Sequence, residues 1–323
     1  MKVVVLLVLF GLGTAVSAGE VPAPPAKLPE GDSGIAAKYP GDTGIEKDPA
    51  VVFADGFEGY SKPSDLGKRW DYVFHDGNMR IVEEAENLYS GKKALECAVP
   101  KGAELSVGIG KVLKEERDVL FLRFYSKFEK GFDITGARST HNGGTISAHY
   151  HRNGNATPGE RADGRNKFLA NYENESVYSE AGTPSPGKLN VYCYHPEQRD
   201  NYGDHFFPTG KIMPNTSKPG NFGKDFIARP DFVPELGRWY CYEFMVKANK
   251  VGQRDGRIAC WVDGKLVADF TNMRLRDVET LEIDHFGIGL FIAKAELRAN
   301  KKWYDNVVAA TSYIGPVKPA GKR

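Results

Sequence analysis

The sequence predicts an all-β fold, a two-sheet antiparallel sandwich of the jelly-roll kind. Short alternating runs rich in Val, Ile, Phe, Tyr and Trp follow one another from Val51 onward, separated by Gly, Pro, Asn and Asp. No long segment carries the 3.6-residue periodicity of an amphipathic helix. The chain has 323 residues, and all-β sandwiches of this length are often single domains. We therefore expect one jelly-roll domain over residues 51–316.

The expected strands are spaced regularly along the chain. They are residues 51–58, 93–99, 119–128, 144–151, 188–195, 238–248, 257–270, 284–293 and 302–315. Trp261–Phe270 reads as a hairpin, because Asp263-Gly264 suits a two-residue turn of type I′. Residues 196–236 form a long stretch rich in Pro, Gly and Asn, and a loop of that length is often functional.

The N-terminus predicts export. Lys2 precedes the apolar run 3–13 and the small-residue site Val16-Ser17-Ala18, the pattern of a signal peptide covering residues 1–18. That run is too short to span a membrane, and no later segment is long and apolar enough. Residues 19–50 read as a Pro/Gly-rich leader partly extended over the domain, and residues 317–323 as a basic tail. We expect a secreted or periplasmic protein without a membrane span.

Net charge and cysteine content limit the partners and the covalent cross-links that the chain can have. The net charge is +1, whereas a general nucleic-acid binder shows a basic excess, so no nucleic-acid partner is expected. We expect a monomer. In an oxidising compartment, one or two disulfides can form among the four cysteines, and sequence alone does not choose the pairing. Buried thiols are the alternative, above all for Cys97. The four are Cys97, Cys193, Cys241 and Cys260.

The segment 143–153, GGTISAHYHRN, is the most informative one for function. Read as one strand, it places Thr145, Ser147, His149 and His151 on one polar face. Its other face is apolar enough to cover a core. A strand of this kind can form the floor of a wet groove that holds a polymer.

Residues 238–270 and 301–316 resemble segments of concanavalin-A-like jelly-roll polysaccharide lyases, and are similar to those of fungal glucuronan lyases and cellulose-induced secreted proteins. The shared layout is a Trp-Tyr strand, a Glu-bearing strand, an Asp-Gly hairpin and a closing Asp-Asn-Val strand. Glu282-Ile283-Asp284 also matches the beginning of the ExDxxE motif of jelly-roll endoglucanases, but Gly287 stands where the last carboxylate belongs. The resemblance therefore implies a lyase rather than a glucanase of that type, with an acidic polysaccharide as its substrate.

β-Elimination on a uronate needs a group that neutralises the carboxylate, a base and an acid. The resemblance implies Arg, Gln, Asn or His for the first task and Tyr or His for the others. We expect His149 or His151 and Tyr192 or Tyr194 to share the base and acid roles. The carboxylate partner is expected among Arg152, Asn190 and Gln198.

A structural calcium site is a further implication of the resemblance. Such domains often tie an opening Asp-x-Phe-Glu strand to a closing Asp-Asn strand through calcium, which needs six to eight oxygen ligands. The expected ligands are the carboxylates of Glu58 and Asp305 and the backbone carbonyls of Ser90 and Lys93.

Other functions compete with the lyase. His149, His151 and a third ligand such as His195 can bind zinc, although no motif marks the third ligand. A carbohydrate-binding jelly roll without catalysis uses the same aromatic residues to stack on sugars. A glycoside hydrolase requires a carboxylate pair in the groove, for which Glu173, Glu175 and Glu243 are the candidates.

Overall fold

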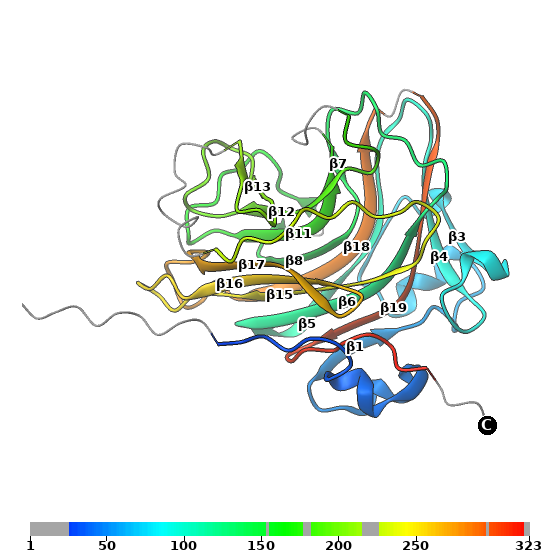
Figure 1. Cartoon of the computed structure of the whole chain (residues 1–323), viewed down its shortest axis with the longest axis horizontal. Coiled ribbons are helices and arrows are strands. Elements are labelled where there is room, and N and C mark those ends of the chain that lie inside the picture. Colours follow the sequence, from blue (N-terminus) through cyan, green and yellow to red (C-terminus); the bar gives the residue numbers. More distant parts are fainter. Residues whose placement is uncertain (1–25, 153–154, 177–181, 215–225, 295–296, 320–323) are drawn as a thin grey trace, which may run out of the picture.

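The computed structural model describes residues 26–152, 155–176, 182–214, 226–294 and 297–319. It confirms the all-β jelly roll, with two large antiparallel sheets stacked face to face (Figure 1). Sheet A has the order β17 (Lys265–Met273), β16 (Gly256–Val262), β15 (Tyr240–Lys247), β6 (Val119–Phe128), β19 (Asn300–Ala310), β4 (Ala94–Val99) and β3 (Met79–Val82), with β1 (Val51–Asp55) paired to β19.

Sheet B carries the candidate site. Its order is β14 (Ile212–Met213), β13 (Asp204–Phe206), β12 (Lys188–Tyr194), β11 (Phe168–Glu175), β8 (Gly144–Ala148), β18 (Ile283–Ala293), β5 (Glu104–Arg117) and β2 (Tyr72–Phe74), with β7 (Thr140–His141) paired to β18. A separate two-stranded ribbon joins β9 (His151–Arg152) and β10 (Asn155–Ala156). Short 3₁₀ helices complete the chain: η1 (Ile35–Lys38), η2 (Pro40–Asp42), η3 (Ile45–Lys47), η4 (Pro63–Lys68), η5 (Asp76–Asn78) and η6 (Ala85–Asn87).

The main core fills the space between the two sheets. Ile146, Tyr172 and Leu290 of sheet B are buried in one cluster with Phe124 and Phe244 of sheet A. Because strand side chains alternate, each of these strands of sheet B turns its other residues to the opposite face. That opposite face is where the polar side chains gather.

The predicted hairpin is confirmed. β16 and β17 pair antiparallel, and Val262 lies opposite Lys265 across the turn. Asp263 and Gly264 have φ of 49° and 76°, the positive values that a type I′ turn requires at both central residues.

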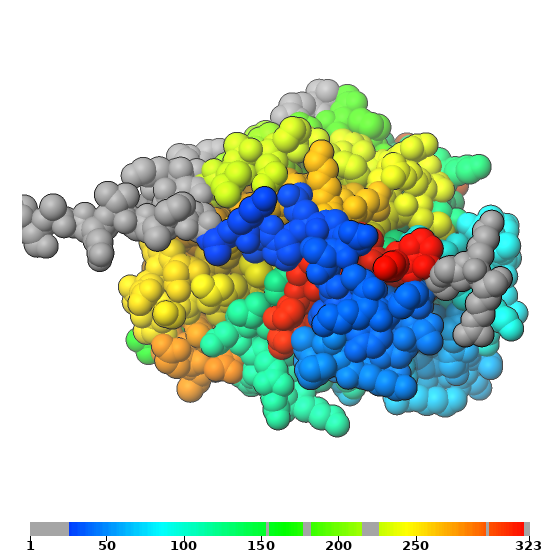
Figure 2. Space-filling view, turned by 60° about the horizontal axis from the view of Figure 1, so that its bottom comes forward, coloured from blue at the N-terminus to red at the C-terminus, as the bar shows by residue number. Residues whose placement is uncertain are grey.

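The predicted leader packs on the outer face of sheet A, where Figure 2 shows it beside the C-terminal residues. Ile35 and Ile45 are buried in a cluster with Trp261. Trp261 donates its indole N–H to the Pro29 carbonyl at 2.8 Å. Asp42 forms an ion pair with the fully buried Arg123. The described part of the segment thus lies over the domain surface and contains the short 3₁₀ helices η1, η2 and η3. The predicted signal peptide lies outside the described residues.

The cysteines form no disulfide. All four thiols are buried and free, so of the two alternatives left open by the sequence the structure has buried thiols. Burial raises the pKa of each thiol, which keeps it protonated. In the described part of the chain, no helix is long and apolar enough to cross a membrane.

The histidine strand is interrupted, contrary to the expectation of one strand over residues 143–153. β8 ends at Ala148 and β9 begins at His151. Between them His149 takes a left-handed backbone conformation with φ of 49°, and its N–H donates to the Asp284 carboxylate at 3.0 Å. The turn breaks the alternation, so the two histidines do not share a face.

Candidate active site

A groove of about 740 Å³ crosses the face of sheet B that points away from sheet A. Part of its floor is formed by glycines of β5 and β18. These are Gly108, Gly110, Gly287 and Gly289, with Gly108 opposite Gly289 and Gly110 opposite Gly287. Polar side chains of β8, β11, β12 and β13 also line the groove. Such a trough can admit an extended chain over the glycine floor.

The first polar cluster surrounds His151. Its ring stacks on Tyr72 with centroids 6.1 Å apart and lies 4.1 Å from the His285 ring. Ser147, opposite His285 in the strand register, has its hydroxyl 3.4 Å from His285 Nδ1. His151 Nδ1 and His285 Nε2 are buried and have no hydrogen-bond partner. Both nitrogens can therefore accept or donate a proton within the groove.

Burial keeps both of these imidazoles neutral. It lowers the pKa of His151 to about 4. It also moves the pKa of His285 well below its usual range, and the neighbouring His151 adds to that shift. A neutral imidazole can serve as a general base at neutral pH.

The second polar cluster lies on β7, β11, β12 and β13. His141 Nδ1 lies 2.9 Å from the carboxylate of Glu173. The His141 ring stacks on Tyr192 with centroids 4.8 Å apart, and Tyr192 also faces the ring of His205. His205 Nδ1 in turn contacts the amide oxygen of Asn190 at 2.9 Å.

The electrostatics of the second cluster differ from those of the first. Burial alone lowers the pKa of His141, but the Glu173 carboxylate outweighs it and the net shift is upward. Burial raises the pKa of Glu173 itself, with His141 opposing. Burial lowers the pKa of His205 to about 3. His141 is therefore the groove histidine best placed to carry a positive charge.

The predicted Tyr192 and Tyr194 both line the groove, together with Tyr150. Backbone N–H groups donate to the two hydroxyls, from Gly203 to Tyr192 at 3.0 Å and from Gly159 to Tyr194 at 3.2 Å. These contacts fix the positions of the two hydroxyl groups at the groove. Burial raises the pKa of Tyr150 and of Tyr192, which preserves that proton.

Other predicted residues lie elsewhere. His149 is partly exposed, and its Nε2 contacts the Glu116 carboxylate at 3.2 Å, outside the groove. Arg152 pairs with Glu160 at 2.6 Å on the surface. Asn190 does belong to the second cluster, where it holds His205. Of the histidine pair that the sequence placed together, only His151 lines the groove.

Gln198 has a structural role and does not line the groove. Its side-chain oxygen accepts the N–H of His195 at 3.1 Å, and its nitrogen donates to the carbonyls of Asp200 and Tyr202, both at 2.9 Å. The amide thereby holds the loop 195–203 in shape. Arg199 and Tyr202 of that loop reach the groove.

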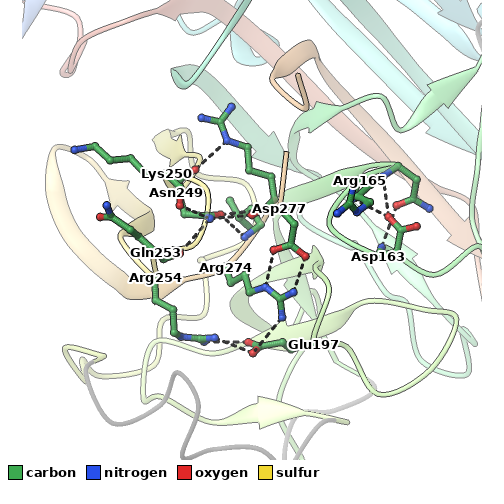
Figure 3. A network of polar contacts seen from close by, with 12 residues as sticks. Asp163, Arg165, Glu197, Asn249, Lys250, Gln253, Arg254, Arg274 and Asp277 are labelled. Atoms are coloured by element: carbon green, nitrogen blue, oxygen red, sulfur yellow. Dashed lines mark hydrogen bonds and ion pairs between the residues drawn. The ribbon is translucent and has the colours of Figure 1, made fainter. Parts of the chain in front are cut away.

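The loop 195–203 is also anchored from outside, as Figure 3 shows. Glu197 receives two hydrogen bonds from Arg254, at 2.7 and 3.0 Å. Arg274 approaches the same carboxylate at 3.9 Å and is itself paired with Asp277 at 2.6 Å. This network fixes the loop that forms one end of the groove.

The three histidines expected for a zinc site do not come together, whereas two of the three glutamates expected for a hydrolase do line the groove. His195 is buried against Asp204, with its Nε2 2.9 Å from that carboxylate, whereas His149 contacts Glu116 and His151 contacts His285. The zinc trio therefore has three separate sets of partners. Glu243 is buried on sheet A, where it accepts the N–H groups of Ile314 and Gly315. Glu173 and Glu175 do line the groove.

Sequence reasoning missed His285. The run 284–293 was predicted as a strand, and its alternation places His285 on the same face as Gly287, Gly289 and Phe291. A histidine followed by two alternate glycines was the available signal for a groove floor. His141 also lines the groove, from β7.

The predicted calcium ligands converge, but not with the expected atoms. Glu58 accepts the N–H groups of Lys92 and Lys93 at 2.8 and 3.2 Å, and Asp305 accepts those of Tyr89 and Ser90 at 3.2 and 3.1 Å. The turn thus directs backbone N–H groups at both carboxylates. Burial, with a smaller contribution from Glu58, raises the pKa of Asp305 to about 7. That unfavourable negative charge suits a cation, so Glu58 and Asp305 remain the ligands that we propose for calcium.

Comparison with solved structures finds the same fold in several lyases. The alginate lyase Aly36B matches with a TM-score of 0.58 at 16% identity, over 84% of this chain and 99% of that chain. The PL-14 alginate lyase from Aplysia kurodai matches at 0.53 and 16%, over 81% and 99%. The endo-β-1,4-glucuronan lyase from the fungus Trichoderma reesei matches at 0.50 and 15%, over 81% and 96%.

At these identities the likeness establishes the jelly-roll fold that the chain shares with alginate and glucuronan lyases. It confirms the resemblance stated from the sequence at the level of fold. No protein-family model matches the chain, and no curated protein sequence matches it. Function has to be argued from the groove.

Proposed function

We propose that this chain is an exported lyase that cleaves a uronate-containing polysaccharide by β-elimination. The observation that carries the proposal is the His151–His285 pair, whose buried nitrogens without partners lie in a groove that tyrosines also line. The solved structures of the same fold include alginate and glucuronan lyases, and variants of Aly36B were solved in complex with alginate tri- and tetrasaccharides. These neighbours support the substrate class.

We assign His151 as the base and Tyr194 as the acid. His151 takes the C5 proton, a double bond forms between C4 and C5, and the C4–O bond breaks. Tyr194 then gives its proton to the leaving oxygen. Arg199, which lines the same end of the groove, faces the uronate carboxylate and offsets the negative charge that develops next to it.

An absorbance assay tests the proposal. Chain lacking residues 1–18 is incubated with alginate, glucuronan, pectate and glycosaminoglycans, and ultraviolet absorbance reports the unsaturated uronate that elimination creates. We expect a rise on at least one substrate, with loss of turnover and retained substrate binding in His151→Gln. His149→Gln is the matched control and is expected to keep its activity, because His149 lies outside the groove. Silence on every substrate, with the folded protein shown intact, would refute the lyase.

One observation favours glycoside hydrolysis as a second candidate. Glu173 and Glu175 project from one strand into the groove, with carboxylate oxygens within 4.8 Å of each other. Retaining glycosidases likewise hold two carboxyl groups close together, roughly 5 Å apart. New reducing ends without new ultraviolet absorbance would support this candidate and contradict elimination.

A further inference from the structure

A cluster of two carboxylates and one imidazole lies in the groove, on β11 and β13, the strands on either side of β12. Glu173 and Glu175 stand two residues apart on β11 and share a face, and His205 stands on β13. One ligating atom from each of these residues lies within 4.8 Å of the other two. All three residues are more than nine-tenths buried, yet all three line the groove. An ion in the groove can therefore reach them together.

The Glu173 carboxylate is incompletely satisfied. Its Oε2 lies 2.9 Å from His141 Nδ1, whereas its Oε1 is buried and accepts no hydrogen bond. His205 Nδ1 lies 3.9 Å from Oε1, beyond hydrogen-bond range. A buried carboxylate oxygen without a donor is unfavourable unless a cation compensates it. The buried, unpartnered Oε1 is thus an observation, independent of the cluster, that points to a cation as a ligand here.

The surrounding residues orient the cluster in the manner of a metal site. An amide oxygen only accepts, so His205 Nδ1 donates to Asn190 Oδ1 at 2.9 Å, and this contact fixes the orientation of the ring beside Glu173. The β11–β12 register places Asn190 opposite Glu173, and Tyr192 lies opposite His205. Metal-ligating histidines usually donate their other nitrogen to such an oxygen, which fixes the ring.

We propose that Glu173, Glu175 and His205 bind one divalent transition-metal ion in the groove. Two carboxylates and an imidazole form a mixed oxygen and nitrogen set that suits Zn²⁺ or Mn²⁺, whereas Ca²⁺ takes oxygen ligands alone. The remaining coordination positions face the groove. There the ion would attract a substrate carboxylate, a use that rests on the proposed lyase function, while the binding itself does not.

Metal content tests the site directly. Untagged protein is stripped with a chelator and titrated with Mn²⁺, followed by the loss of the free-ion electron paramagnetic resonance signal, and Zn²⁺ content is measured by mass spectrometry after dialysis. We expect about one equivalent of ion per chain. Glu173→Gln and Glu175→Gln, which preserve side-chain size, are each expected to weaken Mn²⁺ binding at least tenfold. Glu104→Gln is the matched control, a groove carboxylate paired with Arg138 at 2.5 Å outside the cluster, and it should bind as the unmodified chain does.

Each result decides the proposal. Circular dichroism establishes that the variants are folded, and Glu175→Gln serves if Glu173→Gln does not fold. No binding by the unmodified chain, or equal binding by folded Glu173→Gln and Glu175→Gln, overturns the site. Because these measurements use no polysaccharide, a protein that binds the ion but releases no unsaturated uronate retains the metal site and loses the lyase.

Discussion

The rings of His151 and His285 lie with their centroids 4.1 Å apart in the groove, each with one buried nitrogen that has no hydrogen-bond partner. His285 lies on β18 of sheet B, whereas His151 begins β9 of the separate two-stranded ribbon, which the chain reaches after β8 and the turn at His149. Two neutral imidazoles of this kind can form hydrogen bonds with a polar ligand in the groove. The predictions below test that arrangement and the elements that support it.

Gly110→Ala tests the His285 position without changing a titratable group. A Cβ at this position would lie 2.5 Å from His285 Nε2, so the imidazole must shift. We expect turnover of the uronate substrate to fall at least tenfold, since misplaced catalytic groups lose rate steeply. Gly77→Ala is the control, because its Cβ would have no atom within 4 Å. Unchanged turnover in Gly110→Ala would show that the His285 position does not matter.

The pH dependence of stability tests the burial of His151. Its pKa falls from an ordinary 6.5 to about 4 on folding, with Tyr72, Tyr150 and His285 facing the ring. The unfolded chain therefore binds a proton below pH 6.5 that the folded chain refuses until about pH 4, and stability falls as the pH drops through this window.

The expected size follows from the shift. Between pH 7 and 4.5, this one group lowers the free energy of unfolding by about 2 kcal/mol. Urea unfolding at both pH values, compared with His151→Gln, isolates the contribution because the variant lacks the titrating ring. Equal pH dependence in the two proteins would mean that the ring titrates normally in the folded state.

How far the sequence predicts this molecule depends on which interactions decide each part. The jelly roll, the Asp263-Gly264 hairpin and the shared face of Tyr192 and Tyr194 follow from alternation and turn chemistry, which are local. The contact between His151 and His285 does not follow from such local patterns. It depends on the register between strands that lie far apart in the sequence. The sequence around His149 also gives no indication of its left-handed backbone conformation, because the carboxylate that accepts its N–H belongs to Asp284 on another strand.

Glu197→Gln tests the anchor of the groove loop. The substitution removes the charge that pairs with both hydrogen-bonding nitrogens of Arg254, and a bidentate pair of this kind contributes about 1–3 kcal/mol. We expect the amides of residues 195–203 to exchange with solvent at least tenfold faster in hydrogen-exchange mass spectrometry. Exchange in β15 serves as the internal control, since that strand lies in the other sheet. Unaltered loop exchange would assign the anchoring to Gln198 alone.

Calcium binding at Glu58 and Asp305 predicts a thermal effect separate from the groove. An ion between these carboxylates relieves the buried charge that raises the Asp305 pKa, and a ligand present at 100 times its Kd stabilises a protein by about 2.7 kcal/mol. We expect millimolar Ca²⁺ to raise Tm by several degrees and a chelator to reverse the rise. In Glu58→Gln the rise should disappear, whereas the groove variant Glu175→Gln should retain it. A Tm that is the same with Ca²⁺ and with chelator would contradict the calcium site. The two carboxylates would then serve only as hydrogen-bond acceptors for the backbone N–H groups of the turn.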